Sequence, residues 1–505
     1  MNAEPEKTVI PATWPKGWVP PIPKRSDQSW RIVTGYLLAG LVALPILRYV
    51  SLTNVPFSQQ FIAYFILLLC GWPVVTHLTR REAGLPVFAI ICLVYGAAYA
   101  VPIFTTKPIV MSVDPHGFVG VPEATVTEAL WLTLAGVFSM QIGFWLFKYS
   151  LLNMLVPKVR ISLDLKKARR LALILGTCGA MALWIGMSTT LQLPSRFFGL
   201  FVILNRQAYL SIGLLYWYFL KGELTTFSKV WFIGIVMVFV MLGFALGNFR
   251  NVLDPMMVIL AVHWMLKRRF PWKIVLTGVL LFGIMQPIKG QYRALVWRGG
   301  VAHTSVIDRV GLWFTLIRTG WSGILGGSHG AVENVTRDSL NRTDFIHMFA
   351  HIVDETPRHV PFQHGQTYSY LLVTLVPRLF WPDKPSAQTA NDFFGVSYGF
   401  QTEDSLGTTS IGMPHLLETF INFGVLGVIF VMMLIGMVYA AAERLFNHTE
   451  AGEGGVAAYA VVLTMLLTIE TATAPTFGAL IQTILILILT LRLARKRTVA
   501  PVWQV

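Results

Sequence analysis

Five charged side chains lie inside or beside long apolar stretches, where a membrane would make them costly. An ionisable group at such depth needs a partner or a wet cavity, so each is a candidate functional residue. Arginine binds phosphate oxygens through paired donors, which suits a lipid that carries a diphosphate. The plainer alternative is that Arg250 pairs with Asp254 one helical turn later. The five are Arg206, Arg250, Asp254, Glu418 and Glu470.

The composition is that of a membrane protein. Of the residues, 54% are hydrophobic and 13% are charged, and apolar stretches recur at the length that crosses a hydrocarbon core of about 30 Å. The formal net charge of +15 would suggest nucleic acid in a soluble protein. Here the basic residues concentrate in short loops beside apolar stretches, which is a topology signal, so no nucleic-acid partner is expected.

The cysteines show neither disulfide nor metal-ligand spacing. We expect all three to be small core residues of apolar helices. They are Cys70, Cys92 and Cys178.

The apolar stretches predict an all-α, polytopic membrane protein with about twelve transmembrane helices. The proline-rich residues 1–30 lack the apolar core of a signal peptide and are predicted to be a cytoplasmic tail. Helices one to nine occupy 31–288, a large polar loop occupies 289–412, the last three helices occupy 413–497, and 498–505 form a second tail. The predicted helices are 32–50, 58–78, 84–104, 127–147, 171–192, 198–220, 230–247, 252–268, 272–289, 415–442, 455–472 and 474–494.

Most basic residues of this arrangement fall on the side of the amino-terminal tail. The positive-inside rule therefore places both termini in the cytoplasm and residues 289–412 on the outer face. The sequence has no fixed-period repeat and no similarity between its halves, which argues against a transporter built from duplicated bundles.

The loop at 289–412 carries many aromatic rings beside charged and hydrogen-bonding groups. Such a mixture suits a sugar, whose C–H faces stack on rings while its hydroxyls need directional partners. Alternatively, the rings form an interfacial belt and the small core of a folded loop. Within this loop, 305–325 predict a helix lying on the membrane surface.

Four runs carry a resemblance to a known family. The chain resembles the oligosaccharide repeat-unit polymerases, the Wzy-type O-antigen polymerases of bacterial envelopes, over roughly residues 240–440. The run at 246–251 is similar to a Gly-Ser-Arg turn of that family, but Asn248 and Phe249 stand where small residues are expected. The runs are His364-Gly365-Gln366-Thr367-Tyr368, Val376-Pro377-Arg378-Leu379-Phe380-Trp381-Pro382-Asp383-Lys384-Pro385, Glu418-Thr419-Phe420-Ile421-Asn422-Phe423-Gly424 and Leu246-Gly247-Asn248-Phe249-Arg250-Asn251.

The resemblance implies a GT-C-like glycosyltransferase of the bacterial inner membrane. Such an enzyme joins undecaprenyl-diphosphate-linked oligosaccharides at the periplasmic face, so 289–412 would be a periplasmic loop. Its other expected partners are membrane lipid and a chain-length-regulating co-polymerase. Two rivals stay open: an O-antigen ligase that transfers glycan to lipid A core, and a lipid-linked oligosaccharide flippase.

This chemistry needs cations for the leaving diphosphate and a base for the acceptor hydroxyl. Glu418 and His364 are the candidate bases. Each arginine has the alternative of facing headgroups or pairing within the loop. The predicted diphosphate- and substrate-binding residues are Arg206, Arg250, Arg293, Arg298, Tyr368, Arg378, Trp381 and Lys384.

No cofactor and no metal are expected. The sequence has no DxD motif, which favours a metal-independent transfer. His347 and His351 have the spacing of a metal-binding helix but lack the glutamate of HExxH, and 344–355 predict an amphipathic helix whose polar face is solvated. The run Gly326-Gly327-Ser328-His329-Gly330 matches G-x-S-x-G without the strand and helix that such a nucleophile needs.

Overall fold

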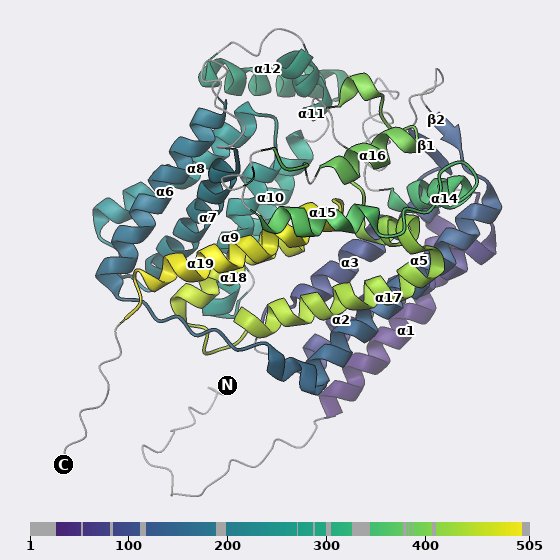
Figure 1. Ribbon diagram of the computed structural model, residues 1–505, viewed down its shortest axis with the longest axis horizontal. Helices are drawn as coiled ribbons and strands as arrows, with labels where there is room; N and C mark the ends of the chain where they lie inside the picture. Colours follow the sequence, from purple (N-terminus) through teal and green to yellow (C-terminus); the bar gives the residue numbers. More distant parts are fainter. Residues whose placement is uncertain are drawn as a thin grey trace, which may run out of the picture.

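The protein is described from a computed structural model (Figure 1). Apart from one short hairpin, the regular structure of the described residues is helical. The described residues are 27–51, 54–80, 84–111, 118–187, 198–269, 271–285, 288–298, 305–325, 344–376, 381, 383–386, 388–406 and 411–496.

The first part of the chain forms helices that run back and forth. They are α1 (Asp27–Val50), α2 (Phe57–Arg80), α3 (Val87–Tyr99), α4 (Pro102–Thr105), α5 (Glu123–Tyr149), the 3-10 turn η1 (Leu151–Leu155), α6 (Leu165–Met187), α7 (Phe198–Leu220), α8 (Thr226–Ala245), α9 (Arg250–Lys267) and α10 (Trp272–Met285). Between α4 and α5, β1 (Ile109–Met111) pairs with β2 (Phe118–Gly120) in an antiparallel hairpin.

Mostly short elements follow, together with the 20-residue α12, and the chain ends with three helices of the bundle. The first of these elements are α11 (Lys289–Arg293), η3 (Ala294–Arg298), α12 (Val306–Leu325), α14 (Phe345–Glu355), α15 (Gln366–Leu375), α16 (Thr389–Ser397) and η5 (Glu403–Ser405). The last elements are α17 (His415–Phe446), α18 (Gly452–Leu466), η6 (Ala474–Gly478) and α19 (Ala479–Arg492).

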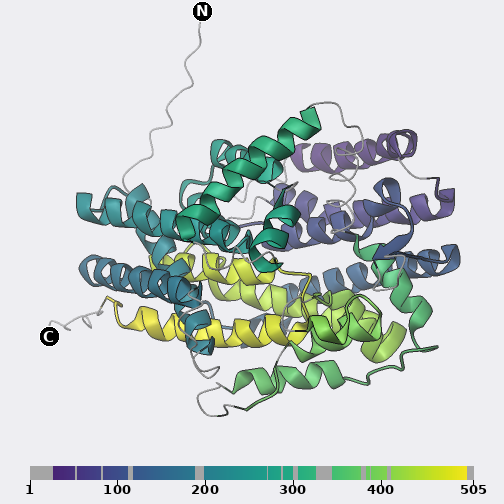
Figure 2. The same cartoon turned by 90° about the horizontal axis from the view of Figure 1, so that it is seen from above.

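Among the residues that the structure describes, eight helices are long and apolar enough to cross a membrane, which confirms the predicted all-α, polytopic class. They are α1, α2, α3 with α4, α5, α6, α8, α17, and η6 with α19. Figures 1 and 2 place α1 at the margin of the bundle.

The other four predicted spans also coincide with helices but are not among those eight. Helix α7 carries Asn205, Arg206 and Gln207 in succession, and α9 begins with Arg250 and Asp254, so their hydropathy is lowered. Helices α10 and α18 have 14 and 15 residues, fewer than the roughly 20 that a bilayer needs. The number of spans therefore stays a prediction.

Backbone hydrogen bonds tie together the connections at one end of the bundle, which we call the basic end. Val159 donates to the Leu445 carbonyl at 2.9 Å, and Ile161 donates to the Ala451 carbonyl at 3.0 Å. Leu163 forms a bridge with Arg495. The basic end thus comprises 84–86, 150–164, 447–451 and 493–496, and the opposite end, which carries α11 to α16, is the loop end.

Helices α5 and α17 touch backbone to backbone in the middle of the bundle. An added Cβ at Gly143 would lie 1.9 Å from the Met433 carbonyl oxygen, and one at Gly436 would lie 1.9 Å from that of Met140. Beside them the Phe88 and Phe144 rings stack at 3.8 Å. Small residues that let backbones approach are the usual basis of helix packing in membranes.

Two expectations about side-chain environments are wrong. Cys70 and Cys92 are buried as expected, but Cys178 is exposed because its position on α6 faces outward. The first part of the polar face of α14 is not solvated, since Asp344 and His347 are 7% and 1% exposed, whereas His351, Asp354 and Glu355 are partly exposed. His347 Nδ1 lies 2.6 Å from Asp344 Oδ2, and Thr106 donates to the same oxygen at 2.6 Å, so the hairpin side of the loop end covers this face. The predicted helix at 305–325 is present as α12, and its place on a membrane stays a prediction.

The contact between α5 and α17 predicts a sharp sensitivity to volume. Gly436→Ala places a methyl group against the Met140 carbonyl and should lower thermal stability by roughly 1–3 kcal/mol, the cost of overpacking. Gly234→Ala is the matched control, because its Cβ meets nothing within 4 Å. Unfolding of the purified protein in detergent, followed by intrinsic fluorescence, measures both. An equal melting temperature for the two variants would contradict the packing described here.

Candidate functional site

Two of the sequence motifs pack directly against each other at the loop end. The Gln363 amide donates to the Ile421 carbonyl at 3.0 Å, and the His364 amide donates to the Asn422 carbonyl at 3.1 Å. The Gly365 amide donates to Asn422 Oδ1 at 3.0 Å. The segment before α15 therefore lies along the first part of α17.

A break in α17 makes this pairing available. Gly424 has φ 61° and ψ −144° inside the helix, a conformation that side-chain-bearing residues rarely adopt. The break deprives the preceding turn of its helical partners, and the amides of 363 and 364 satisfy those carbonyls instead. A Cβ on Gly424 would also lie 3.3 Å from the Phe362 ring.

Glu418, a predicted base, lies beneath this contact with no exposed surface. Its Oε1 accepts from Thr367 Oγ1 at 2.8 Å, and its Oε2 accepts from the Thr473 amide at 2.6 Å. Asn422 Nδ2 donates to Thr367 Oγ1 at 2.7 Å and to the Glu418 carbonyl at 2.8 Å. Because Thr473 precedes η6 and α19, the carboxylate caps a helix start, where a negative charge is stabilised. Within the described residues no arginine forms an ion pair with it.

His364, the other predicted base, presents its side chain to the exterior of the same cluster. Its backbone has φ 47°, an uncommon conformation for a residue other than glycine, and the pairing with Asn422 holds it there. Tyr368 lies one turn further, with its ring stacked on Phe423 at 6.0 Å. Burial raises the pKa of the Tyr368 hydroxyl well above its usual value, and the nearby Glu418 carboxylate adds to the rise.

The remaining predicted residues of this region have separate places. Trp381 is 44% exposed. Lys384 Nζ donates to the Val376 and Val373 carbonyls at 2.6 and 3.1 Å, so it caps the end of α15. Arg378 lies outside the described residues, as does the side chain of Arg298.

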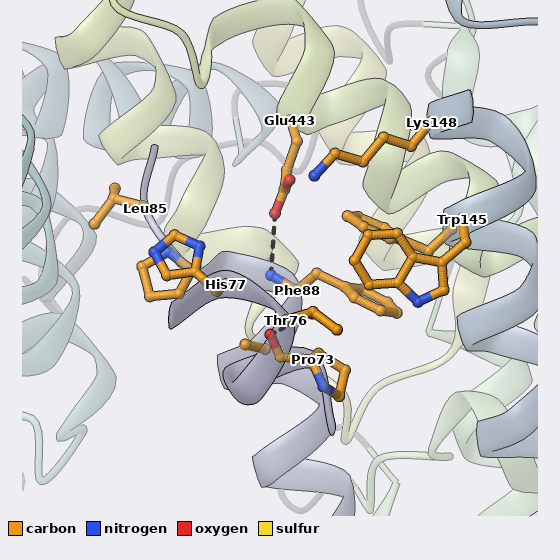
Figure 3. A pocket seen from close by; sticks show the side chains of 11 residues that line it. Pro73, Thr76, His77, Leu85, Phe88, Trp145, Lys148 and Glu443 are labelled. Carbon is orange, nitrogen blue, oxygen red and sulfur yellow. Dashed lines mark hydrogen bonds between the residues drawn. The ribbon is translucent and has the colours of Figure 1, made fainter. Parts of the chain in front are cut away.

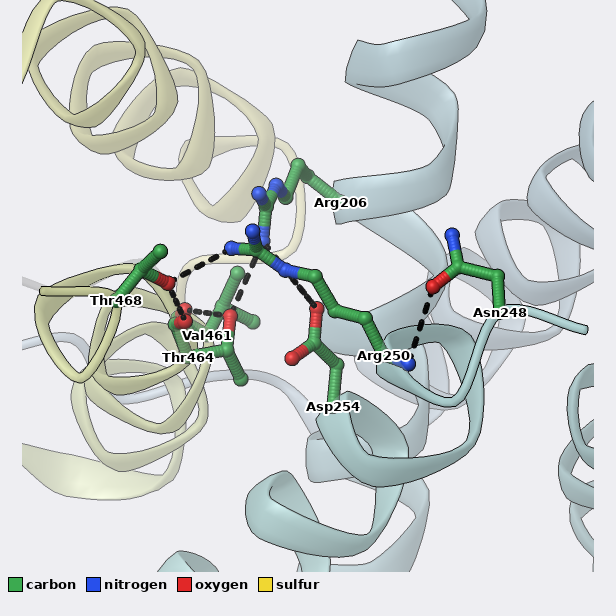
Figure 4. A network of polar contacts seen from close by, with 7 residues as sticks. All are labelled: Arg206, Asn248, Arg250, Asp254, Val461, Thr464 and Thr468. Atoms are coloured by element: carbon green, nitrogen blue, oxygen red, sulfur yellow. Dashed lines mark hydrogen bonds and ion pairs between the residues drawn. The ribbon is translucent and has the colours of Figure 1, made fainter. Parts of the chain in front are cut away.

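A second cluster joins two arginines to one carboxylate (Figure 4). Arg250 Nε lies 3.5 Å from Asp254 Oδ2, and Arg206 Nη1 lies 3.9 Å from the same oxygen. The expected pairing of Arg250 with Asp254 is thus present, but it is shared. Arg206 also donates to Thr464 Oγ1 at 3.1 Å and Arg250 to Thr468 Oγ1 at 2.9 Å. The Arg250 side chain is 45% exposed, whereas those of Arg206 and Asp254 are 17% and 5% exposed.

The turn between α8 and α9 gathers further cations around Arg250. Arg293 Nε donates to the Gly247 carbonyl at 3.0 Å, and Lys289 Nζ lies 4.8 Å from the centre of the Phe249 ring. Tyr292 donates to the Ala245 carbonyl at 2.8 Å, and burial raises the pKa of its hydroxyl to about 12. The loop end thus presents two guanidinium groups and an ammonium group around this turn.

The connection between α18 and α19 touches both clusters. Thr468 meets Arg250, and Thr473 meets Glu418 five residues later. Between them, the Ala472 amide donates to Asn391 Oδ1 at 3.4 Å, and this oxygen also accepts from the Met413 amide at 3.0 Å. Sequence reasoning missed Thr468, Thr473 and Asn391. Only the clustering of threonines at 464–476 beside a predicted span end offered a signal.

A pocket at the basic end is a poor candidate for a large ligand (Figure 3). Its volume is about 20 Å³, roughly enough for one water molecule. Glu443, in its wall, accepts from the Phe88 amide at 3.1 Å and so caps the start of α3. A sugar or diphosphate does not fit there, and the candidate site remains the two clusters of the loop end.

The eight apolar helices define the class of the protein, which is an all-α, multi-pass membrane protein. Within that class, residues 328–491 match a domain of unknown function (DUF8712). The matched segment contains the Glu418 cluster, whereas Arg206 and Arg250 precede it. No curated protein and no solved structure matches the chain.

The Glu418 contacts predict a structural effect of its loss. Glu418→Ala leaves the Thr473 amide and the Thr367 hydroxyl without their acceptor, which should cost about 1–3 kcal/mol for each buried donor. Glu470→Ala is the control, since this glutamate lies exposed in the connection between α18 and α19. Thermal unfolding in detergent compares the two, and a Glu418→Ala protein as stable as the control would contradict the cap.

Proposed function

We propose that the protein is a GT-C-like membrane glycosyltransferase that polymerises undecaprenyl-diphosphate-linked oligosaccharide repeat units at the periplasmic face of the inner membrane. The observation that carries the proposal is the Arg206–Asp254–Arg250 cluster at the loop end. Two guanidinium groups share one carboxylate, so the cluster keeps a net positive charge, and the outer arginine is half exposed. The motif resemblance supplies the substrate class.

The proposed reaction breaks the bond between an anomeric carbon and a diphosphate oxygen. A hydroxyl of the acceptor glycan forms the new glycosidic bond, its proton passes to a base, and the electron pair of the broken bond leaves with the diphosphate. Fixed cations beside the leaving group lower the barrier because its charge grows in the transition state. Arg250 can approach phosphate oxygens with its fork of donors, while Asp254 and Thr468 hold that fork in place.

We assign the proton acceptor to His364 in preference to Glu418. Both Glu418 oxygens already accept hydrogen bonds in a fully buried place, whereas the His364 ring is exposed beside the same motif. Glu418 then positions the motif from below. The exposed Trp381 ring remains as a proposed sugar contact, whereas the Tyr368 hydroxyl is buried and does not reach a ligand at the surface.

The proposed membrane orientation follows the charge distribution. Lys148, Lys158 and Arg160 lie at or beside the basic end with Arg495 and Lys496, and basic residues are retained on the cytoplasmic side. Both termini are then cytoplasmic, and the loop at 289–412 is periplasmic.

The direct test incubates the purified protein with an undecaprenyl-diphosphate-linked repeat unit and resolves the products by electrophoresis. We expect a ladder of glycans from the unaltered protein. Arg250→Ala should lower the rate about 100-fold or more, as removal of one transition-state donor does, and Arg250→Lys should restore part of it. Arg318→Ala, an exposed arginine of α12, is the control and should retain full activity.

Other products would overturn the proposal. Transfer of a single glycan to lipid A core, without a ladder, would identify a ligase. Movement of the lipid across vesicles without a new glycosidic bond would identify a flippase.

A separate comparison tests the base. His364→Ala should lower the rate constant of transfer while leaving the melting temperature unchanged, because its ring is exposed. Glu418→Gln should lower the melting temperature, because it replaces an oxygen that accepts a hydrogen bond. Full activity of His364→Ala would remove this histidine from the mechanism.

A further inference from the structure

A hollow of about 590 Å³ lies on the side of the bundle between α1, α2 and α5. Its lining residues are apolar apart from the Tyr36 hydroxyl, which donates to the Leu68 carbonyl, and the indole N–H groups of two tryptophans. The rings at its rim are open to the surroundings, since Trp72, Trp131 and Phe138 are 39%, 58% and 54% exposed. In a membrane such a hollow faces hydrocarbon.

The faces of α2 and α5 that line the hollow continue toward the basic end, and we call these two faces together the groove. On α2, Phe65, Leu69 and Trp72 line it, and Thr76 and Arg80 follow at the same helical spacing. On α5, residues 131, 135 and 138 line it, and residues 145 and 149 follow. From Phe65 to Arg80 this face is about 22 Å long at 1.5 Å per residue. One leaflet of a bilayer core is about 15 Å thick, so this face is long enough to run along a whole acyl chain of that leaflet.

Cations and aromatic rings close the groove at the basic end. The Arg80 guanidinium reaches from α2 across to α5, at 5.4 Å from the Trp145 ring and 5.1 Å from the Tyr149 ring. Lys148 Nζ lies 5.3 Å from the Trp145 ring, and Figure 3 shows its amine directed into the space beside Glu443. Glu443 is the carboxylate among the described residues that line the pocket here, and it accepts a hydrogen bond from the Phe88 amide at the positive start of α3.

We propose that this groove binds one anionic phospholipid, with an acyl chain in the hollow and the phosphate across Arg80 and Lys148. The apolar hollow matches an acyl chain, the length of the face matches a lipid that extends through one leaflet, and the cations at its end match the phosphate. Basic pockets between membrane helices recognise anionic headgroups in this way, and tryptophan and tyrosine favour the headgroup level. The phosphate lies over the mouth of the small pocket beside Glu443 and does not need to enter it.

The proposal is independent of the proposed transfer reaction. The cations of the groove lie at the basic end, and the arginine cluster lies at the loop end. If the lipid experiment fails, the glycosyltransferase proposal still stands. If the transfer assay gives no ladder of glycans, the proposed lipid site still stands.

The headgroup is tested by native mass spectrometry of the full chain in detergent, titrated with dioleoylphosphatidylglycerol or dioleoylphosphatidylcholine. The first anionic lipid should bind roughly 25-fold more tightly than the zwitterionic one, because each of two cations contributes about fivefold. Arg80→Gln and Lys148→Gln should each weaken phosphatidylglycerol binding about fivefold and phosphatidylcholine binding less, because the choline group offsets the charge of its phosphate. Lys166→Gln, an exposed lysine at the start of α6, is the control. Equal affinity for both lipids, or no effect of the two variants, would overturn the headgroup assignment.

The hollow is tested by filling it. Ala135→Trp places an indole in the groove and should abolish retention of the first phosphatidylglycerol, whereas Gly234→Trp on the open face of α8 should not. Retention by Ala135→Trp would overturn the groove. Undecaprenyl phosphate is added as a competitor, and its displacement of phosphatidylglycerol at equal concentration would reassign the site to a polyprenyl lipid.

Discussion

The buried carboxylate of Glu418 holds three segments of the loop end in one arrangement. It accepts the Thr367 hydroxyl from α15 and the Thr473 amide from the start of η6, while its own helix α17 supplies the Asn422 amide that completes the contact. Both donors are buried, so loss of the acceptor would leave the Thr367 hydroxyl and the Thr473 amide with the full cost of their desolvation. The break at Gly424 depends on the same contact, because the segment before α15 satisfies the carbonyls that the break exposes.

A carboxylate organises the arginine cluster in a comparable way. Asp254 is nearly inaccessible, yet it faces both Arg206 and Arg250. With one negative charge for two positive ones, the outer guanidinium is oriented but not neutralised. The threonines at 464 and 468 provide the remaining acceptors. Such an arrangement presents a fixed positive charge to an anion with little reorganisation when the anion arrives.

Local patterns in the sequence predicted the helices well, and long-range contacts account for what they missed. Apolar length alone located α1 to α10 and α17 to α19, since a bilayer constrains each helix separately. The helical spacing of the two residues predicted the pairing of Arg250 with Asp254, which lie one helical turn apart. It could not reveal that Arg206 shares that carboxylate, because this depends on how α7 packs on α9. The burial of His347 likewise depends on Thr106, which is 241 residues away along the chain.

The roles of the motif residues show the same limit. The two motif runs that contain His364, Glu418 and Asn422 lie against each other in the structure. The motif did not distinguish His364, whose side chain faces outward, from Glu418, whose side chain caps a helix. Lys384 likewise caps a helix end. That distinction requires the position of Thr473, which belongs to no motif.

The connection between α18 and α19 joins the two clusters through a stretch of only five residues. Thr468 holds the exposed arginine, Thr473 holds the buried glutamate, and Asn391 pins the backbone between them. The two clusters therefore share one backbone segment, whose position is set at Thr468 by Arg250, at Ala472 by Asn391 and at Thr473 by Glu418.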